Sequence, residues 1–383
     1  MSIQNIDLPP SVTIEKADDE SEEYIMNIGP QHPSTHGVLR LVAKLDGEYI
    51  KEIVPVLGYI HRGIEKMGES QTYVQYIHLT DRMDYLASHF NNLCICLTIE
   101  KAMDIGVPER AEYIRVIVCE LQRIESHLLW WGVLGMDLGA ITAFLYGFRE
   151  REMIADIFDE LCGARLTTNY FRPGGSFADI PDTFIPRVNS FLDQMEKMIV
   201  EYDTLLTNNI ILHERTKGVG ILSKEKAVAF GCTGPFARGS GVDFDLRKHA
   251  PYSVYDRFDF DVPLGKVGDS FDRYMVRMLE IRESIKIIKQ AIKGLPDGPY
   301  RSKELGSYKL PKGSYYAEVE TPRGIFSNYM VATGKSQNPY RVKNRSPGFS
   351  NLSVMNELAK GLKLADLITI MSTMDLVIPD IDR

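Results

Sequence analysis

Residues 109–128 read ERAEYIRVIVCELQRIESHL and follow Pro108, which fits the first turn of a helix. Apolar residues recur along this segment at spacings of three and four, namely Ile114, Ile117, Leu121, Ile124 and Leu128. This spacing predicts a helix with one buried stripe. The opposite side of the helix carries Arg115, Glu120 and Arg123. A helix of this length indicates that a helical core lies at the centre of the fold.

The next stretch, Leu128 to Phe148, is apolar except for Asp137 and is long enough to span a bilayer. A carboxylate near the middle of a span costs roughly 2.5 to 3.5 kcal/mol on insertion scales. Glycines lie around Asp137 at positions 132, 135 and 139. We therefore expect a break between two buried helices of a soluble core. The buried carboxylate then needs a charged or hydrogen-bonding partner, for which an imidazole is a good candidate.

Outward from this core, helical patterns cover residues 81–103, 136–161, 185–206 and 270–292, with Thr80 as the expected N-cap of the first. Alternating apolar residues before an Asp-Gly turn signal predict a hairpin over 38–56. Strands are expected on both sides of a turn at 322–324, and helices return over 352–371. The predicted fold class is α+β and mostly α, with an N-terminal antiparallel sheet, a central helical bundle, and C-terminal strands and helices.

The chain divides into four predicted parts. Residues 1–23 end in an acidic run and are expected to form a mobile leader, because they cannot bury enough apolar surface to order themselves. Residues 24–60 are expected to form a hairpin or sheet, residues 61–293 the helical bundle, and residues 294–383 a C-terminal α/β segment.

The composition narrows the classes of partner. The 383 residues are 44% hydrophobic, enough for a large core, and a formal net charge of -8 supplies no basic surface for nucleic acid. A partner is therefore expected to be protein. Five cysteines, an odd number, indicate reduced and inert thiols in a cytosolic compartment. The first residues show no signal peptide, since no apolar core follows a charged region.

Residues 29–37 read GPQHPSTHG and place His32 and His36 in a loop stiffened by two prolines. Such a loop can hold an imidazole in a fixed place. An HxxxH pair on a helix would suggest zinc, but Pro33 lies between the two histidines and no third ligand follows. On these residues alone, the alternative stays open that this is a structural loop whose histidines are hydrogen-bonded within the fold.

Tyr85, in the run DRMDY at 81–85, offers a phenol at an expected helix start, although a packed tyrosine with a satisfied hydroxyl is the commoner case. Residues 171–175 read FRPGG and lack the spacing of nucleotide-binding loops. Cys94 and Cys96 lack the spacing that holds iron–sulfur clusters. Any such cluster is therefore expected on another subunit.

Several runs, in their number, order and spacing, resemble the D-type subunit family of bacterial respiratory complex I. The runs are GPQHPSTHGVLR at 29–40, HRGIEK at 61–66, DRMDY at 81–85, Glu120 with Arg123 and His127, RPGG at 172–175, and the closing Asp382-Arg383. The matches extend from about Tyr24 to the last residue, so the resemblance is highly specific. It implies a fold similar to that of the nickel–iron hydrogenase large subunit.

Those hydrogenases provide a second interpretation from another class of chemistry. They carry RGxE, a spacer of sixteen residues and RxCGxC, whereas here the RGIE run at 62–65 is followed by Asp84 and Ala87 at the two cysteine positions. The closing run DLVIPDIDR at 375–383 echoes a DPCxxCxxR pattern without cysteine. Nickel requires thiolate ligands, so neither hydrogenase activity nor a metal bound by this chain is expected.

The resemblance implies that a quinone head-group site replaces the metal. By motif match, Tyr85 and His36 hydrogen-bond the two quinone carbonyls, His32 belongs to the same loop, and Asp137 orients and charge-balances His36. The residue types suit this role, because an unperturbed phenol ionises near pH 10 and an imidazole near roughly pH 6.5. Both can therefore protonate a developing quinolate.

The resemblance also implies the partners. Electrons are expected from an iron–sulfur cluster on a small B-type subunit, with Arg62 and Arg82 close to it, and C-type and membrane-arm subunits complete the assembly. The chain is expected to be a peripheral protein on the cytoplasmic side of the bacterial cell membrane, active only within a proton-translocating NADH:quinone oxidoreductase. A relative fed by ferredoxin or reduced deazaflavin is the alternative, and a catalytically silent scaffold is a third hypothesis.

One position departs from the family pattern. Many relatives read ARMH before the RPGG turn, whereas residues 164–167 read ARLT here. The family histidine is associated with the pH dependence of the terminal cluster's potential, and Thr167 cannot titrate. We therefore expect a weaker dependence on pH, a lower cluster potential, and a low-potential acceptor such as menaquinone.

Overall fold

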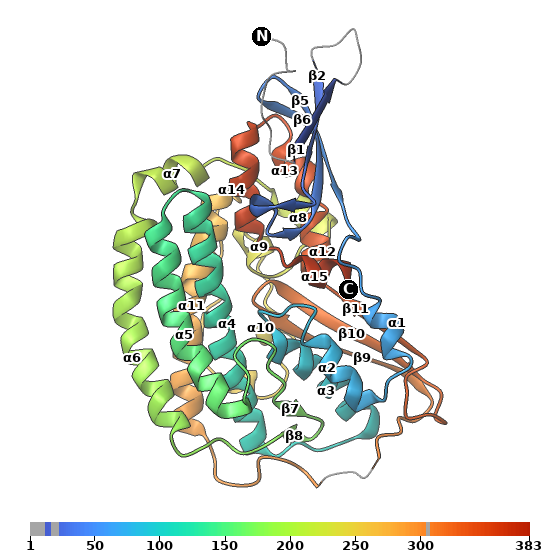
Figure 1. The fold of residues 1–383 in the computed structure, drawn as a ribbon. Coiled ribbons are helices and arrows are strands. Elements are labelled where there is room, and N and C mark those ends of the chain that lie inside the picture. Colours follow the sequence, from blue (N-terminus) through green and yellow to red (C-terminus); the bar gives the residue numbers. More distant parts are fainter. Residues whose placement is uncertain (1–11, 17–22, 304–306) are drawn as a thin grey trace.

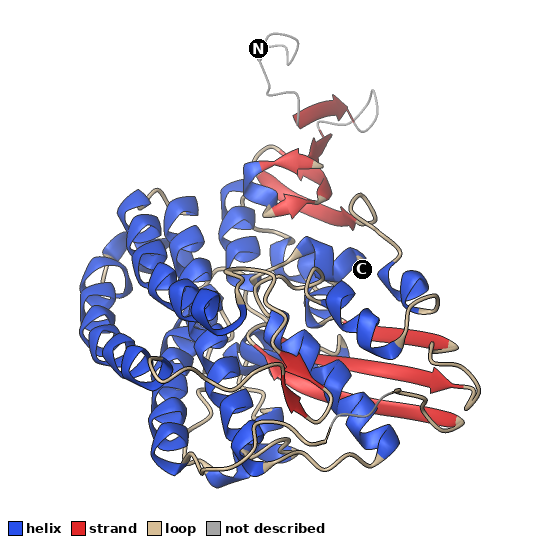
Figure 2. Cartoon of the chain, turned by 60° about the horizontal axis from the view of Figure 1, so that its bottom comes forward, coloured by secondary structure: helices blue, strands red, loops and turns tan. Residues whose placement is uncertain are grey.

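The computed structural model describes residues 12–16, 23–303 and 307–383. Long helices form one side of the molecule, and a three-stranded sheet with helices packed against it forms another (Figure 1). A four-stranded sheet stands at the end that carries the first described residues. Figure 2 shows the same division, with most helices gathered on one side and the long strands on the other. The predicted fold class, α+β and mostly helical, is confirmed.

The N-terminal sheet is antiparallel, in the order β1-β2-β5-β6. Its strands are β1 (Val12–Lys16), β2 (Glu23–Ile28), β5 (Arg40–Asp46) and β6 (Tyr49–Val56). Leu41, Ala43 and Leu45 of β5 share one buried face, as alternation along a strand requires. The pairing of β5 with β6 confirms the predicted hairpin over 38–56.

Strand β1 lies within the range 1–23 that we expected to form a mobile leader. It pairs with β2 from Val12 opposite Ile28 to Lys16 opposite Tyr24. Ladder hydrogen bonds to a neighbouring strand order this part of the chain, a source of order that composition does not reveal. Residues 1–11 and 17–22 lie outside the described residues, so for them the leader stays a prediction.

Four long helices form the bundle. They are α4 (Glu109–Asp137), α5 (Ile141–Cys162), α6 (Phe184–Tyr202) and α11 (Ser270–Gly294). Helix α4 begins after Pro108, and its predicted apolar stripe is buried. The opposite side of α4 is buried too, because this helix packs against α5, α11, α14 and α3. Arg115, Glu120 and Arg123 are therefore core residues with 0% exposure.

The expected break near Asp137 is present, but α5 starts at Ile141 rather than at the predicted residue 136. Glycine lets α4 and α5 approach closely, because a Cβ added at Gly147 would lie 2.7 Å from the Leu128 carbonyl oxygen. Within the described part of the chain, no helix is both long and apolar enough to cross a membrane.

Three helices precede the bundle: α1 (Ile64–Gly68), α2 (Tyr73–Thr80) and α3 (Ser88–Met103). The predicted helix over 81–103 is wrong in its first seven residues, which form turns between α2 and α3. Thr80 is the last residue of α2 and not an N-cap, and its hydroxyl donates to the Ile77 carbonyl at 2.8 Å. The Asn91 amide of α3 donates to the carbonyls of Thr80 and Asp84, so a side chain replaces helical hydrogen bonds here.

The C-terminal sheet is antiparallel, in the order β11-β10-β9. Its strands are β9 (Gly313–Thr321), β10 (Gly324–Ala332) and β11 (Arg341–Arg345), of which the first two were predicted. The helical pattern over 352–371 resolves into separate short helices. They are α12 (Pro347–Leu352), α13 (Met355–Ala359), α14 (Leu364–Met374) and α15 (Ile378–Asp382). Gly361, with a φ of 82°, lies in the break between α13 and α14.

Short elements connect these parts. They are β3 (Gln31–His32), β4 (Gly37–Val38), β7 (Phe171–Arg172), β8 (Gly175–Ser176), α7 (Ile210–Thr216), α8 (Lys224–Ala229), α9 (Gly234–Gly239) and α10 (Leu246–His249). One hydrophobic cluster fills the bundle and the three-stranded sheet. A second cluster contains Leu41 and Ile53 together with Leu358 and Met371, so the N-terminal sheet and the C-terminal helices share a core.

Candidate functional site

The loop at residues 29–37 is held by its own backbone. Strands β3 and β4 pair across it, and the Thr35 hydroxyl lies 2.7 Å from the His32 carbonyl and 2.8 Å from the Gly37 carbonyl. His36 has a φ of 54°, in the left-handed region that non-glycine residues seldom adopt. Such a conformation persists only where the surroundings fix it, so the loop presents the His36 ring in a defined position.

The contact expected between His36 and Asp137 is present. His36 Nε2 lies 2.7 Å from Asp137 Oδ2, although the two residues are 101 positions apart in the chain. The Ser372 hydroxyl donates to the same carboxylate oxygen. Among the described residues, His36 Nδ1 and Asp137 Oδ1 make no hydrogen bond. Each side chain therefore keeps one polar atom available.

His36, Asp137 and Tyr85 line one cavity of ≈ 170 Å³. The other lining residues are Pro33, Leu86, Leu129, Trp130, Val133, Met136, Asp375, Leu376 and Val377. Three residues predicted from distant parts of the sequence thus meet at one cavity with mainly apolar walls. Small-molecule sites typically combine such walls with a few polar groups.

His32 does not line this cavity. It lines a second, apolar cavity of ≈ 180 Å³ between the N-terminal sheet and α14, together with Met26, Leu41 and Met371. The His36 loop therefore presents its two histidines to two different spaces. A quinone contact by His32 stays a prediction that this placement does not favour.

Tyr85 lies on the turn between α2 and α3 and is half-buried. Burial, and after it the neighbouring Asp84 carboxylate, raises the pKa of Tyr85 above its usual value. The phenol is therefore neutral at physiological pH. Its hydroxyl makes no hydrogen bond to any described residue, so the proton is available to a molecule in the cavity.

Arg323 supports the cavity wall next to Tyr85. Its guanidinium binds Asp84 through Nε at 2.5 Å and Nη2 at 2.8 Å, and Asp375 through Nη1 at 3.2 Å. Since Asp375 lines the cavity and Asp84 precedes Tyr85, one cation holds two parts of the wall. Asp84, which the motif match aligns with a hydrogenase cysteine, forms an ion pair with Arg323 here.

Arg62 and Arg82 are neighbours on the surface. The Arg62 guanidinium donates to the Arg82 carbonyl, and the Arg82 side chain is 53% exposed. The loop that carries Thr167 packs on the same turn, because the Asn169 amide donates to Asp81 Oδ2 at 2.9 Å. Arg62 and the loop of Thr167 therefore both contact the turn that carries Arg82. By the motif match, Thr167 occupies the position of the family histidine.

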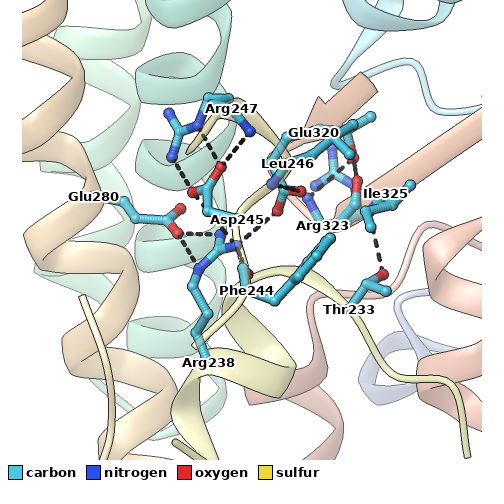
Figure 3. Close-up of polar contacts among 12 residues, drawn as sticks. Thr233, Arg238, Phe244, Asp245, Leu246, Arg247, Glu280, Glu320, Arg323 and Ile325 are labelled. Atoms are coloured by element: carbon cyan, nitrogen blue, oxygen red, sulfur yellow. Dashed lines mark hydrogen bonds and ion pairs between the residues drawn. The ribbon is translucent and has the colours of Figure 1, made fainter. Parts of the chain in front are cut away.

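A second polar cluster, the buried ion network, lies between α4, α9, α10, α11 and β9 (Figure 3). It consists of Glu120, Arg123, Arg238, Asp245, Arg247, Glu280 and Glu320, each at most 1% exposed. Arg238 donates to Glu280, and it donates to Glu320 at 2.8 Å. Arg247 binds Asp245 at 2.7 Å. No sequence pattern predicts this network, because its members come from distant segments of the chain.

Across residues 12–16, 23–303 and 307–383, no group of three or more His, Cys, Asp or Glu side chains is placed to hold a metal ion. The absence of a bound metal stays a prediction, which metal analysis of the purified chain tests. The five cysteines are free, and burial raises the pKa of Cys94 and Cys96 far above the usual range. Such buried thiols are unreactive.

Comparison with known proteins identifies the family. A family profile described as respiratory-chain NADH dehydrogenase, 49 Kd subunit, matches residues 137–307 and 304–383. The D-type subunit of the NADH-quinone oxidoreductase of Bacillus cereus is 51% identical over 363 residues, which are 94% of this chain and 99% of that protein. This chain belongs to the D-type subunit family of complex I. The corresponding protein of Bacillus mycoides is also 51% identical, over the same shares of both chains.

A fused relative extends the comparison. The C/D fusion protein of the NADH-quinone oxidoreductase of Bacteroides thetaiotaomicron is 51% identical over 383 residues, 99% of this chain and 72% of that protein. Membership of the D-type family makes this chain a peripheral-arm subunit of NADH:quinone oxidoreductase. The hydrogenase interpretation is thereby set aside.

Several residues of the site were not predicted from the sequence. Trp130 and Asp375 line the cavity, Arg323 supports it, and Ser372 contacts Asp137. Asp375 lies in the run that echoes a hydrogenase pattern, and Arg323 lies in a predicted turn, so a signal was present at both positions. Ser372 carries no signal, because a single serine in an apolar helix has no motif.

Proposed function

We propose that the cavity lined by His36, Tyr85 and Asp137 binds the quinone head group in the assembled complex and supports its reduction. One observation carries the proposal: a phenol, an imidazole and a carboxylate from distant segments line the same cavity of ≈ 170 Å³. The apolar walls suit an aromatic ring, and the available hydroxyl and ring nitrogen suit its two carbonyl oxygens.

In this proposal each ring nitrogen of His36 has its own role. Nε2 lies against Asp137, which leaves Nδ1 for the substrate. With Asp137 ionised, Nε2 donates to the carboxylate, and Nδ1 can also donate only when the ring is a doubly protonated imidazolium. The Asp137 carboxylate contacts Nε2 and thereby orients the ring.

Quinone reduction takes two electrons and two protons. In the proposed reaction, the Tyr85 hydroxyl gives its proton to one carbonyl oxygen and His36 Nδ1 gives a proton to the other, so the product is the neutral quinol. The two electrons arrive one at a time from an iron–sulfur cluster on a B-type partner subunit. Tyr85 and His36 are then reprotonated from solvent.

The proposed partners correspond to parts of the surface. The C/D fusion relative supports a C-type subunit beside this chain. Arg62 and Arg82, both exposed, are proposed to face the cluster-bearing B-type subunit. Near the cavity, Met136 and Ile141 are 41% and 57% exposed, which supports contact with membrane-arm subunits. The chain would then lie as a peripheral protein on the cytoplasmic side of the cell membrane, with menaquinone as the favoured acceptor.

The predicted C-terminal segment, residues 294–383, is proposed to close the cavity. It contributes Asp375, Leu376 and Val377, which lie between α14 and α15. These residues line the same cavity as His36, which lies near the other end of the chain. The boundaries of the four predicted parts stay predictions.

The test is Tyr85→Phe in the assembled complex, with NADH:quinone turnover compared with reduction of an artificial acceptor. Phenylalanine keeps the ring and removes the proton donor, so we expect quinone turnover to fall on the order of a hundredfold. Artificial-acceptor activity and subunit content should stay at wild-type levels. Unchanged quinone turnover in this variant removes Tyr85 from the mechanism.

A further inference from the structure

The Ser372 hydroxyl contacts the site only through Asp137. Ser372 is buried on α14, and its hydroxyl donates to Asp137 Oδ2, which also accepts from His36 Nε2. The serine does not line the cavity and lies 235 residues from Asp137 in the chain. Two donors from separate segments therefore converge on one carboxylate oxygen.

A second contact of Ser372 does not depend on its side chain. The Trp130 indole N–H donates to the Ser372 carbonyl at 2.7 Å. Trp130 and Asp137 are both on α4, seven residues apart, so they lie on the same face two turns from each other. The backbone contact docks α14 on α4, which leaves the hydroxyl free for a separate role.

We propose that Ser372 is a positioning residue for quinone reduction, which fixes the Asp137 carboxylate so that Oδ2 receives two donors and Oδ1 stays available. This inference rests on the proposed function of the cavity. The terminal torsion of an aspartate is broad, so one donor defines its rotation poorly and two donors define it well. The oriented carboxylate then directs the His36 ring, since Nε2 contacts the same oxygen.

The surrounding groups offer no replacement for this hydroxyl. Within the described residues, His36 and Ser372 are the only hydrogen-bond partners of the Asp137 carboxylate. Asp375, the other carboxylate of the cavity wall, is bound by Arg323. Loss of the serine hydroxyl therefore leaves His36 as the single group that orients Asp137.

The first experiment compares Ser372→Ala with Ser372→Thr in the assembled complex. Alanine keeps the backbone contact to Trp130, and we expect quinone turnover to fall on the order of tenfold, which corresponds to about 1.4 kcal/mol. Artificial-acceptor reduction should not change. Threonine keeps the hydroxyl and should restore turnover. Thr369→Val, which removes a hydroxyl from the same helix on the side that contacts Arg215, is the matched control and should keep full turnover.

A double-mutant cycle covers the case in which threonine is too large for the buried position. In an Asp137→Ala background, Ser372→Ala should cost little further turnover, because the acceptor of the serine hydroxyl is gone. A full tenfold loss in that background shows a purely structural role and overturns the inference.

The outcomes separate this inference from the function on which it rests. Wild-type turnover in Ser372→Ala, together with strong losses in His36→Ala and Asp137→Ala, overturns the role of Ser372 alone. Wild-type turnover in His36→Ala, Asp137→Ala and Tyr85→Phe overturns the quinone site itself.

Discussion

The buried ion network and the cavity use polar and charged side chains in opposite ways. In the network, Arg238 lies between Glu280 and Glu320, and the groups bind one another without access to solvent (Figure 3). In the cavity, His36 and Asp137 bind each other and still keep an available nitrogen and oxygen. Polar groups that bind one another hold a structure, whereas polar atoms left available at a cavity can bind a substrate.

The pKa shifts of the two regions show the same contrast. Burial alone would raise the pKa of Glu280, but Arg238 and then His127 outweigh it and hold that pKa well below the usual range. For Tyr85 burial prevails, and the Asp84 carboxylate adds to it, so its pKa rises. Glu280 is thus held in its charged form, and the cavity keeps a neutral donor in Tyr85.

The largest expected effect comes from breaking the network. Arg238→Met removes the cation between two buried carboxylates, and breaking a buried pair costs about 3–5 kcal/mol. We expect the purified variant to unfold at much lower urea concentration than the wild type, or to be missing from the assembled complex. The matched control is Arg165→Met, which breaks an exposed pair with Asp156 and should cost about 0–1 kcal/mol. Equal urea midpoints of unfolding for the two variants contradict the stabilising role of Arg238 in the buried ion network.

Breaking the cavity pair should affect turnover and leave the fold intact. His36→Ala and Asp137→Ala should each lower quinone turnover by about a hundredfold, because each removes part of one proton-donating unit. The double variant should be no more than slightly worse than either single variant, since the two side chains act together. Turnover with quinone and unfolding in urea are measured on all four proteins. Losses that multiply in the double variant show that the pair does not act as a unit.

Two sources together predicted the His36–Asp137 contact. A carboxylate inside an apolar run needs a partner, and the resemblance to the family indicated His36 as that partner. The hairpin over 38–56 and the break after α4 were predictable because local turn residues specify them. These two features depend on neighbours in the sequence.

Other features depend on contacts between residues that are far apart in the sequence. The turn at residues 81–87 replaces a predicted helix because Asn91 and Arg323 bind its backbone and Asp84. The polar side of α4 is buried because α11, far along the chain, supplies partners for Glu120, such as Ser284. Ser372 reaches Asp137 only through the docking of α14 on α4. Tertiary packing determines all three.

Asp380, a buried residue of α15, allows a smaller test based on pH. Burial, and after it the Asp84 charge, raises the pKa of Asp380 to about 7, whereas an unfolded aspartate titrates near roughly 4. The folded state therefore holds a proton that the unfolded state has lost, so this group's stabilisation is full below about pH 4 and falls as pH rises towards 7.

Asp380→Asn should remove this dependence. At pH 8 we expect the variant to be more stable than the wild type by on the order of 1–3 kcal/mol, and at pH 4 to have no such advantage. Urea unfolding at several pH values measures the difference. Asp261→Asn, at an 86% exposed carboxylate, is the control and should not alter the pH dependence. An equal slope in Asp380→Asn and the wild type contradicts the raised pKa.

The smallest expected effect concerns the surface near Arg82, where Thr167 stands at the position of the family histidine. A group that gains a proton when a cluster gains an electron couples potential to pH, by at most about 59 mV per unit for a one-electron step. Thr167 cannot titrate, so the terminal cluster of the partner subunit should show a shallow slope between pH 6 and 8. Thr167→His should steepen the slope and raise the potential, because it adds a titratable positive charge on the loop that packs against the Arg82 turn. Redox titration of the assembled complex by electron paramagnetic resonance at several pH values measures both changes, with Thr167→Gln as a polar variant that cannot titrate. A wild-type slope near the full one-electron value, unchanged by histidine, shows that the proton is held by another group, and the preference for menaquinone then loses its support.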